Sequence, residues 1–168
     1  MNFPHMRGSQ KKPRAEYATD EQFRQLFADD SNGLYLLSLL LTGNPEMATR
    51  CFVAGLDECV KENFGYYKWA NTWARRIIVR NAVRMVMPRA GTFRAAQTIS
   101  SEPDKAEVPQ DLLPDSSYAN ILRLQDYERF VYVLSVLEKY SDQEIAVLLN
   151  VSRSEICERR ARANQLCG

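Results

Sequence analysis

The sequence predicts an all-α protein made of two small helical domains joined by a flexible linker, the C-terminal one a helix-turn-helix. Apolar residues recur at helical spacing, two Ser-x-x-Glu capping boxes lie near the C-terminus, and no stretch alternates with period two. A chain of 168 residues, 45% of them hydrophobic, can bury a core but is too short for a large multidomain enzyme.

The N-terminal elements follow from their boundary residues. Residues 1–18 contain two prolines and no apolar period, so we expect a disordered basic arm. Thr19 or Asp20 can cap a first short helix. Ser31 opens a second helix, whose end is predicted at Gly43 because glycine tolerates the left-handed conformation found there.

Two further helices complete the expected N-terminal domain, residues 19–88. Pro45 suits the first position of a third helix over residues 45–63, since that position needs no amide hydrogen. A fourth helix over residues 67–87 is long and basic, and Pro88 ends it.

A change in composition predicts the domain boundary. Residues 89–117 hold three prolines, an acidic excess and no apolar period, which is typical of a linker. The helical pattern returns over residues 118–168, where a short lead-in is followed by an amphipathic helix that ends near Lys139.

The strongest local signal lies at the C-terminus. Ser141-Asp-Gln-Glu144 and Ser152-Arg-Ser-Glu155 are capping boxes, and two capped helices joined by a three-residue turn form a helix-turn-helix. Its second helix typically enters the major groove of DNA. We expect its apolar residues Ile156, Ala163 and Leu166 to pack on the first helix. The candidate DNA-binding residues are Ser152, Arg153, Ser154, Glu155, Arg159, Arg160 and Arg162. A helical hairpin within a core is the alternative.

The net charge of +1 hides segregated blocks of charge. Residues 17–62 and 99–128 are mainly acidic, whereas every charged residue from 63 to 95 is a base. Projection of the fourth helix gathers aromatic and basic side chains on one face, which suits single-stranded nucleic acid because bases stack on indole and guanidinium planes. The candidate residues are Trp69, Trp73, Arg76, Arg80 and Arg84. Alternatively, the tryptophans belong to the core and the arginines form a solvated edge.

Other functional classes have little support in the sequence. Its cysteines form no Cys-x-x-Cys pair and are predicted to be reduced, mostly buried thiols, so we expect no metal and no cofactor. They are Cys51, Cys59, Cys157 and Cys167. The chain has no glycine-rich phosphate loop and no usable histidine, so we expect no enzyme and no small-molecule substrate. Without a secretory segment or a run long enough to cross a membrane, a cytoplasmic protein is expected.

The C-terminal stretch from Phe130 to Ala163 resembles region four of RNA polymerase sigma factors of the extracytoplasmic-function type. That family has the pattern S-x-x-E-I-A-x-L-L-x-V-S, then a hydrophobic residue followed by Arg three and six positions later. The matching residues are Ser141, Glu144, Ile145, Ala146, Leu148, Leu149, Val151, Ser152, Ile156, Arg159 and Arg162. LuxR-type regulators contain similar helix-turn-helix patterns.

The N-terminal half resembles region two of the same family. A leucine-rich helix precedes Thr42-Gly-Asn-Pro-Glu46, similar to the family's T-G-D/N-P-E turn, and residues 73–84 resemble its promoter-melting helix. The resemblance implies that region two holds unpaired bases of the minus-ten element while region four binds the minus-thirty-five element. It implies double-stranded and locally melted promoter DNA, the RNA polymerase core and an anti-sigma factor as partners.

The polymerase-docking segment is degenerate. Where the family carries an acidic D-L-V-Q-E-like sequence, this chain has Arg50-Cys-Phe-Val-Ala54. The acids just downstream, Asp57, Glu58 and Glu62, are the candidate docking residues. The sequence therefore leaves three hypotheses open: a divergent sigma factor, a stand-alone helix-turn-helix regulator derived from one, or a protein-interaction domain that never touches DNA.

Overall fold

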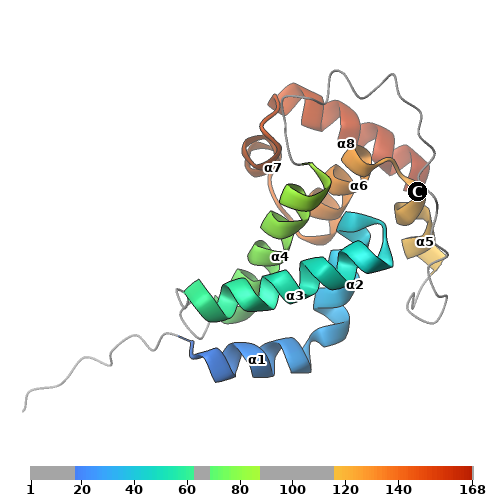
Figure 1. The fold of residues 1–168 in the computed structure, drawn as a ribbon. Helices are drawn as coiled ribbons and strands as arrows, with labels where there is room; N and C mark the ends of the chain where they lie inside the picture. Colours follow the sequence, from blue (N-terminus) through green and yellow to red (C-terminus); the bar gives the residue numbers. More distant parts are fainter. Residues whose placement is uncertain (1–17, 63–68, 88–115, 168) are drawn as a thin grey trace, which may run out of the picture.

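The computed structural model describes residues 18–62, 69–87 and 116–167, which form a series of helices without a strand (Figure 1). The all-α prediction is confirmed. The elements are α1 (Asp20–Asp29), α2 (Ser31–Thr42), α3 (Pro45–Glu62), α4 (Ala70–Val86), α5 (Ser116–Arg123), α6 (Asp126–Tyr132), the π-helical turn η4 (Val133–Leu137), α7 (Asp142–Leu149) and α8 (Arg153–Cys167). No helix in the described ranges is both long and apolar enough to cross a membrane.

Local signals in the sequence determine where the first helices begin and end. The Thr19 hydroxyl accepts from the Gln22 amide at 3.3 Å, while the Gln22 side chain accepts from the Thr19 amide at 2.8 Å. Gly43 ends α2 with a φ of 68°, in the left-handed region. The Asn44 side chain then accepts from the first amides of α3, that of Glu46 at 2.9 Å among them. The predicted helix breaks in this region are confirmed.

Some predicted boundaries differ from the observed ones. Residues 1–17 of the predicted arm lie outside the described ranges, but its last residue, Ala18, is fully buried in the core. α4 begins at Ala70, and residues 67 and 68 of the predicted fourth helix lie outside the described residues. Two residues of the predicted linker belong to α5, because that helix begins at Ser116, and the rest of the linker lies outside the described residues.

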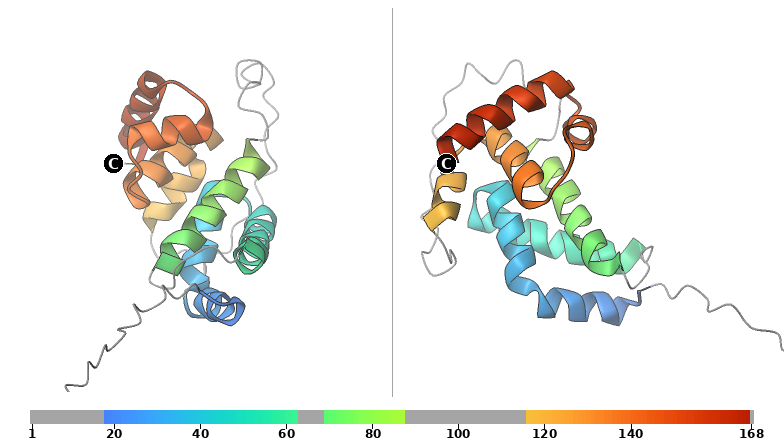
Figure 2. Two further views of the ribbon diagram at one scale, coloured as in Figure 1. Left: turned by 90° about the vertical axis from the view of Figure 1, so that its left-hand side faces the viewer. Right: turned by 180° about the vertical axis from the view of Figure 1, so that it is seen from behind.

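The N-terminal helices pack around α2, which contacts both α3 and α4, while α1 lies along α3 (Figure 1). The second view of Figure 2 shows α2 passing from α1 toward the C-terminal helices. Buried side chains of both halves belong to one continuous apolar cluster, in which Leu41 and Ile77 join Phe130 and Leu134. Burial of this apolar surface is the main stabilising contribution to the fold.

Two arginines make polar contacts between the halves. Arg129 of α6 is almost fully buried, and its guanidinium donates to the backbone oxygens of Leu124 at 3.1 Å and Leu41 at 3.5 Å. Arg75 of α4 forms a two-pronged ion pair with Glu138, which follows η4. The N-terminal and C-terminal helices are therefore joined by oriented hydrogen bonds as well as by apolar packing.

We expect Gly43→Ala to lower the free energy of unfolding by about 2 kcal/mol. Alanine would have to adopt the left-handed backbone conformation of Gly43, and its methyl group would lie 2.7 Å from the guanidinium carbon of Arg129. Urea unfolding followed by circular dichroism measures the change. An unfolding midpoint equal to that of the parent chain would contradict this account of the α2 terminus.

Two expectations about side chains need correction. Cys51 and Cys59 are buried, but Cys157 is exposed and Cys167 is partly exposed, and no disulfide links the four. Leu166, expected to pack inside the helix-turn-helix, is 59% exposed, because it lies to one side of the stripe formed by Ile156 and Ala163, whereas the next residue, Cys167, continues that stripe and packs against the core.

Candidate nucleic-acid interface

The helix-turn-helix is formed by α7 and α8. The Ser141 hydroxyl accepts from the Glu144 amide at 3.3 Å, and the Glu144 carboxylate accepts from the Ser141 amide at 2.9 Å. Hydrogen bonds from the backbone and hydroxyl of Ser141 hold the pKa of Glu144 below its ordinary value. The first predicted capping box is therefore confirmed.

The turn and the start of α8 also follow the expected pattern. Asn150 ends α7 in the left-handed conformation, with a φ of 53°. The Ser152 hydroxyl accepts from the Glu155 amide at 3.2 Å, which is one half of the second capping box. The Glu155 carboxylate makes no return bond to the Ser152 amide within the described part of the chain. Ile156 and Ala163 are fully buried, as predicted, and attach α8 to the rest of the domain.

The arginines of α8 differ in their surroundings. Arg159 and Arg160 lie on the flanks of the buried stripe, where Arg159 lies 3.7 Å from Glu128 and Arg160 donates to Asp142 at 2.7 Å. Arg162, more exposed, lies 3.5 Å from the same Glu128. These three guanidinium groups connect α8 to α6 and α7, so part of their charge is already balanced inside the protein.

A different set of side chains forms the outer face of α8. Opposite the buried Ile156 and Ala163, the helix presents Ser154, Glu158, Ala161 and Gln165 to solvent. Sequence reasoning selected the arginines by charge and missed three of these four. A projection of α8 around its two buried residues would have found them, since a helix has a fixed period of 3.6 residues.

Arg153, the first residue of α8, is exposed and has no ion-pair partner among the described residues. We expect Arg153→Ala to reduce the slope of log affinity against log salt concentration for duplex DNA by about 0.9, the value for one neutralised phosphate. The melting temperature should not change. Arg160→Ala is the comparison, because loss of its hydrogen bond to Asp142 should lower the melting temperature instead. An unchanged salt slope for Arg153→Ala would contradict phosphate binding at this position.

The second candidate surface is the stripe on α4. Trp69, just before the helix, is 67% exposed, so for this residue the alternative of a core tryptophan is wrong. Trp73 is half-buried, and its indole nitrogen has no hydrogen-bond partner among the described residues. Arg76, one turn further along, is exposed. These residues stand on one side of α4, as the helical projection predicts.

The last two arginines of the stripe contact an acid from α3. Arg80 donates to Oε1 of Glu58, and Nη1 of Arg84 lies 3.4 Å from the same oxygen. The Asn81 amide donates to the other oxygen, Oε2, at 2.7 Å. Burial alone would raise the pKa of Glu58, but the hydrogen bonds from Asn81 and Arg80 and the charges of both arginines outweigh it and lower that pKa.

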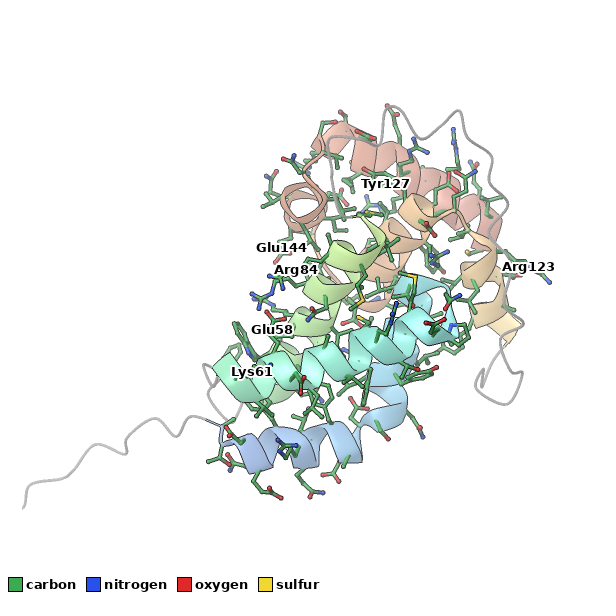
Figure 3. All side chains as sticks on the ribbon, viewed as in Figure 1. Glu58, Lys61, Arg84, Arg123, Tyr127 and Glu144 are labelled. Carbon is green, nitrogen blue, oxygen red and sulfur yellow. The ribbon has the colours of Figure 1, made fainter. Side chains whose placement is uncertain are left out.

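The three candidate docking acids are therefore not equivalent. Glu58 is only 18% exposed and faces α4 (Figure 3). Asp57 is exposed and makes no ion pair within the described ranges. Glu62 ends α3, and its side chain lies outside the described residues. Of the acids that the structure describes on this segment, Asp57 is the one turned toward solvent.

A groove of about 430 Å³ separates the stripe on α4 from the helix-turn-helix. One wall contains Trp73, Arg76 and Arg80 of α4, and the other contains Val147 and Leu148 of α7. The stripe on α4 therefore lies next to α7, and the lining of this groove includes none of the candidate DNA-binding residues of α8. The chain matches no protein-family model and no curated protein.

Proposed function

We propose that this protein is a divergent sigma factor, which binds promoter DNA and directs transcription initiation by bacterial RNA polymerase. The observation that carries the proposal is the combination of a helix-turn-helix on α7 and α8 with an exposed aromatic and basic stripe on α4. The first suits duplex DNA and the second suits unpaired bases. On this proposal the chain has no catalytic activity of its own, needs no cofactor and acts in the cytoplasm.

The stripe on α4 offers the interactions that a melted strand needs. Unpairing and flipping a base costs a few kcal/mol, and interactions made only with the open strand must offset that cost. The exposed indole of Trp69 provides a plane on which a base can stack, worth about 1–3 kcal/mol, and Arg76 lies within two turns of it to bind phosphate.

Simultaneous binding of both promoter elements requires the two halves to separate. The minus-ten and minus-thirty-five elements lie about 25 base pairs apart, or about 85 Å along the duplex. The stripe on α4 and helix α7 line one groove, and both halves share one apolar cluster. A protein that keeps its halves packed together in this way cannot reach both elements at once. Opening would break the ion pair between Arg75 and Glu138 and the hydrogen bond from Arg129 to α2.

A second candidate function is a stand-alone regulator that binds DNA through the helix-turn-helix and no longer docks on polymerase. The ion pairs of Glu58 with Arg80 and Arg84 favour this second function, because they direct the carboxylate toward α4 and not toward a docked polymerase. If the chain does dock on polymerase, Asp57 is the described acid on which docking depends.

Co-purification of the tagged chain with bacterial core RNA polymerase separates the two candidates. A sigma factor is expected to retain the core at physiological salt, and Asp57→Asn should weaken that retention. Glu21→Gln, a change of equal charge at an exposed site on α1, is the control. A folded chain that binds duplex DNA but retains no core would support the regulator and exclude the sigma factor.

A further inference from the structure

Glu58 is an acid of the N-terminal half that is paired with three side chains of α4. It lies on α3 where this helix meets α4 (Figure 3). Its carboxylate receives Arg80 and Arg84 on one oxygen and Asn81 on the other. Asn81 is buried and also donates to the Ile77 carbonyl at 3.0 Å. The asparagine therefore keeps the carboxylate in one position, directly behind the two arginines.

The arginines themselves remain accessible. The side chain of Arg84 is 59% exposed and that of Arg80 is 37% exposed, so a polyanion can approach both. Ion pairs made by side chains that are this accessible to solvent are weak, and each contributes about 0.2–1 kcal/mol to stability. A phosphate group can therefore compete with Glu58 for these guanidinium groups.

We infer that Glu58 is an internal counter-ion that weakens the binding of nucleic acid to the stripe on α4 by competing with phosphate for Arg80 and Arg84. This inference deepens the proposed function and rests on the same surface of α4. Glu58 thereby limits indiscriminate binding to single strands, so that tight binding requires the additional interactions made by Trp69 and Arg76. Glu58 therefore sets the affinity of the stripe for nucleic acid and does not serve as a docking residue for polymerase.

The test compares Glu58→Gln with Glu21→Gln in the full chain. Both substitutions make the same chemical change and add one unit of positive charge, but Glu21 is exposed on α1 and makes no hydrogen bond or ion pair in the described part of the chain. Glutamine at position 58 keeps the size of the side chain and can still accept from Asn81. Melting temperatures establish that both variants fold.

The probe is a fluorescent single-stranded oligonucleotide, titrated by anisotropy at several salt concentrations. Glu58→Gln is expected to bind about 2-fold to 30-fold more tightly than the parent at low salt, since two weak ion pairs no longer compete. The slope of log affinity against log salt should steepen by about 0.7 for each additional phosphate that the variant neutralises. Glu21→Gln should change affinity less than about twofold. In a Glu58→Gln background, Arg84→Gln should remove part of the increase in affinity.

Other outcomes overturn the inference. Equally tightened binding by the two glutamine variants would mean that net charge alone acts, and weaker binding by Glu58→Gln would mean that the carboxylate orients the arginines for DNA. No binding of the oligonucleotide by any variant would remove both this inference and the proposed stripe. Tighter binding by Glu58→Gln in a chain that never supports promoter-directed initiation would leave the inference standing while the proposed sigma function fails.

Discussion

Arg129→Met is expected to lower the free energy of unfolding by about 2–4 kcal/mol, the largest effect that we predict for a single charged residue. Methionine fills most of the space of the arginine but donates no hydrogen bond. The backbone oxygens of Leu41 and Leu124 then lose a donor in the interior, at about 1–3 kcal/mol each. Asp126, at 2.5 Å from the guanidinium, is itself exposed and becomes hydrated.

The buried Nε of Arg129 has no hydrogen-bond partner in the part of the chain that the structure describes, and removing this unsatisfied group offsets part of the loss. Urea unfolding of Arg129→Met beside Arg123→Met measures the difference, because Arg123 lies exposed on the neighbouring helix α5. The control should stay within about 0.5 kcal/mol of the parent. Equal stabilities for the two variants would contradict a structural role for the hydrogen bonds between α6 and the end of α2.

Trp69→Ala is expected to weaken binding to a single-stranded oligonucleotide by about 5-fold to 150-fold, the equivalent of one stacked base. The side chain is largely exposed, so its truncation removes little packing and should leave the melting temperature unchanged. Binding to a duplex through α7 and α8 should also persist. This combination distinguishes a base-stacking residue from a tryptophan that contributes only to the fold.

Val53→Ala provides the matched control for this substitution, since Val53 is an apolar side chain of α3 that is 51% exposed. It should alter neither stability nor affinity for the oligonucleotide. A loss of affinity shared by both variants would indicate nonspecific damage to the protein. Undiminished single-strand binding by a folded Trp69→Ala chain would rule out stacking on this indole.

Elements with local causes could be predicted from the sequence. The Thr19 cap, the left-handed Gly43, the start of α3 at Pro45 and the capping box at Ser141 each depend on residues within four positions of one another. Such short-range hydrogen bonds and backbone preferences leave a readable pattern. The helix-turn-helix was therefore placed with its turn at the observed residues, 150–152.

Features that depend on tertiary packing could not be predicted in this way. The sequence showed an acidic block before residue 63 and a basic block after it, but α3 packs on α4 and brings Glu58 of the first block to Arg80 of the second. Helical projection placed the stripe on α4 correctly, but it says nothing about what lies opposite. The burial of Arg129 likewise depends on the packing of α6 against the end of α2. Its partner there, Leu41, lies 88 residues away in the sequence.

Run-off transcription with core RNA polymerase shows whether this chain directs initiation at a promoter. Templates selected for binding to the purified chain would be transcribed with core alone, with core plus the parent chain, and with core plus Trp69→Ala. We expect transcripts of defined length that require the parent chain and are reduced by Trp69→Ala. Transcription that does not depend on the chain, with the core shown to be active with another sigma factor, would contradict the proposed function.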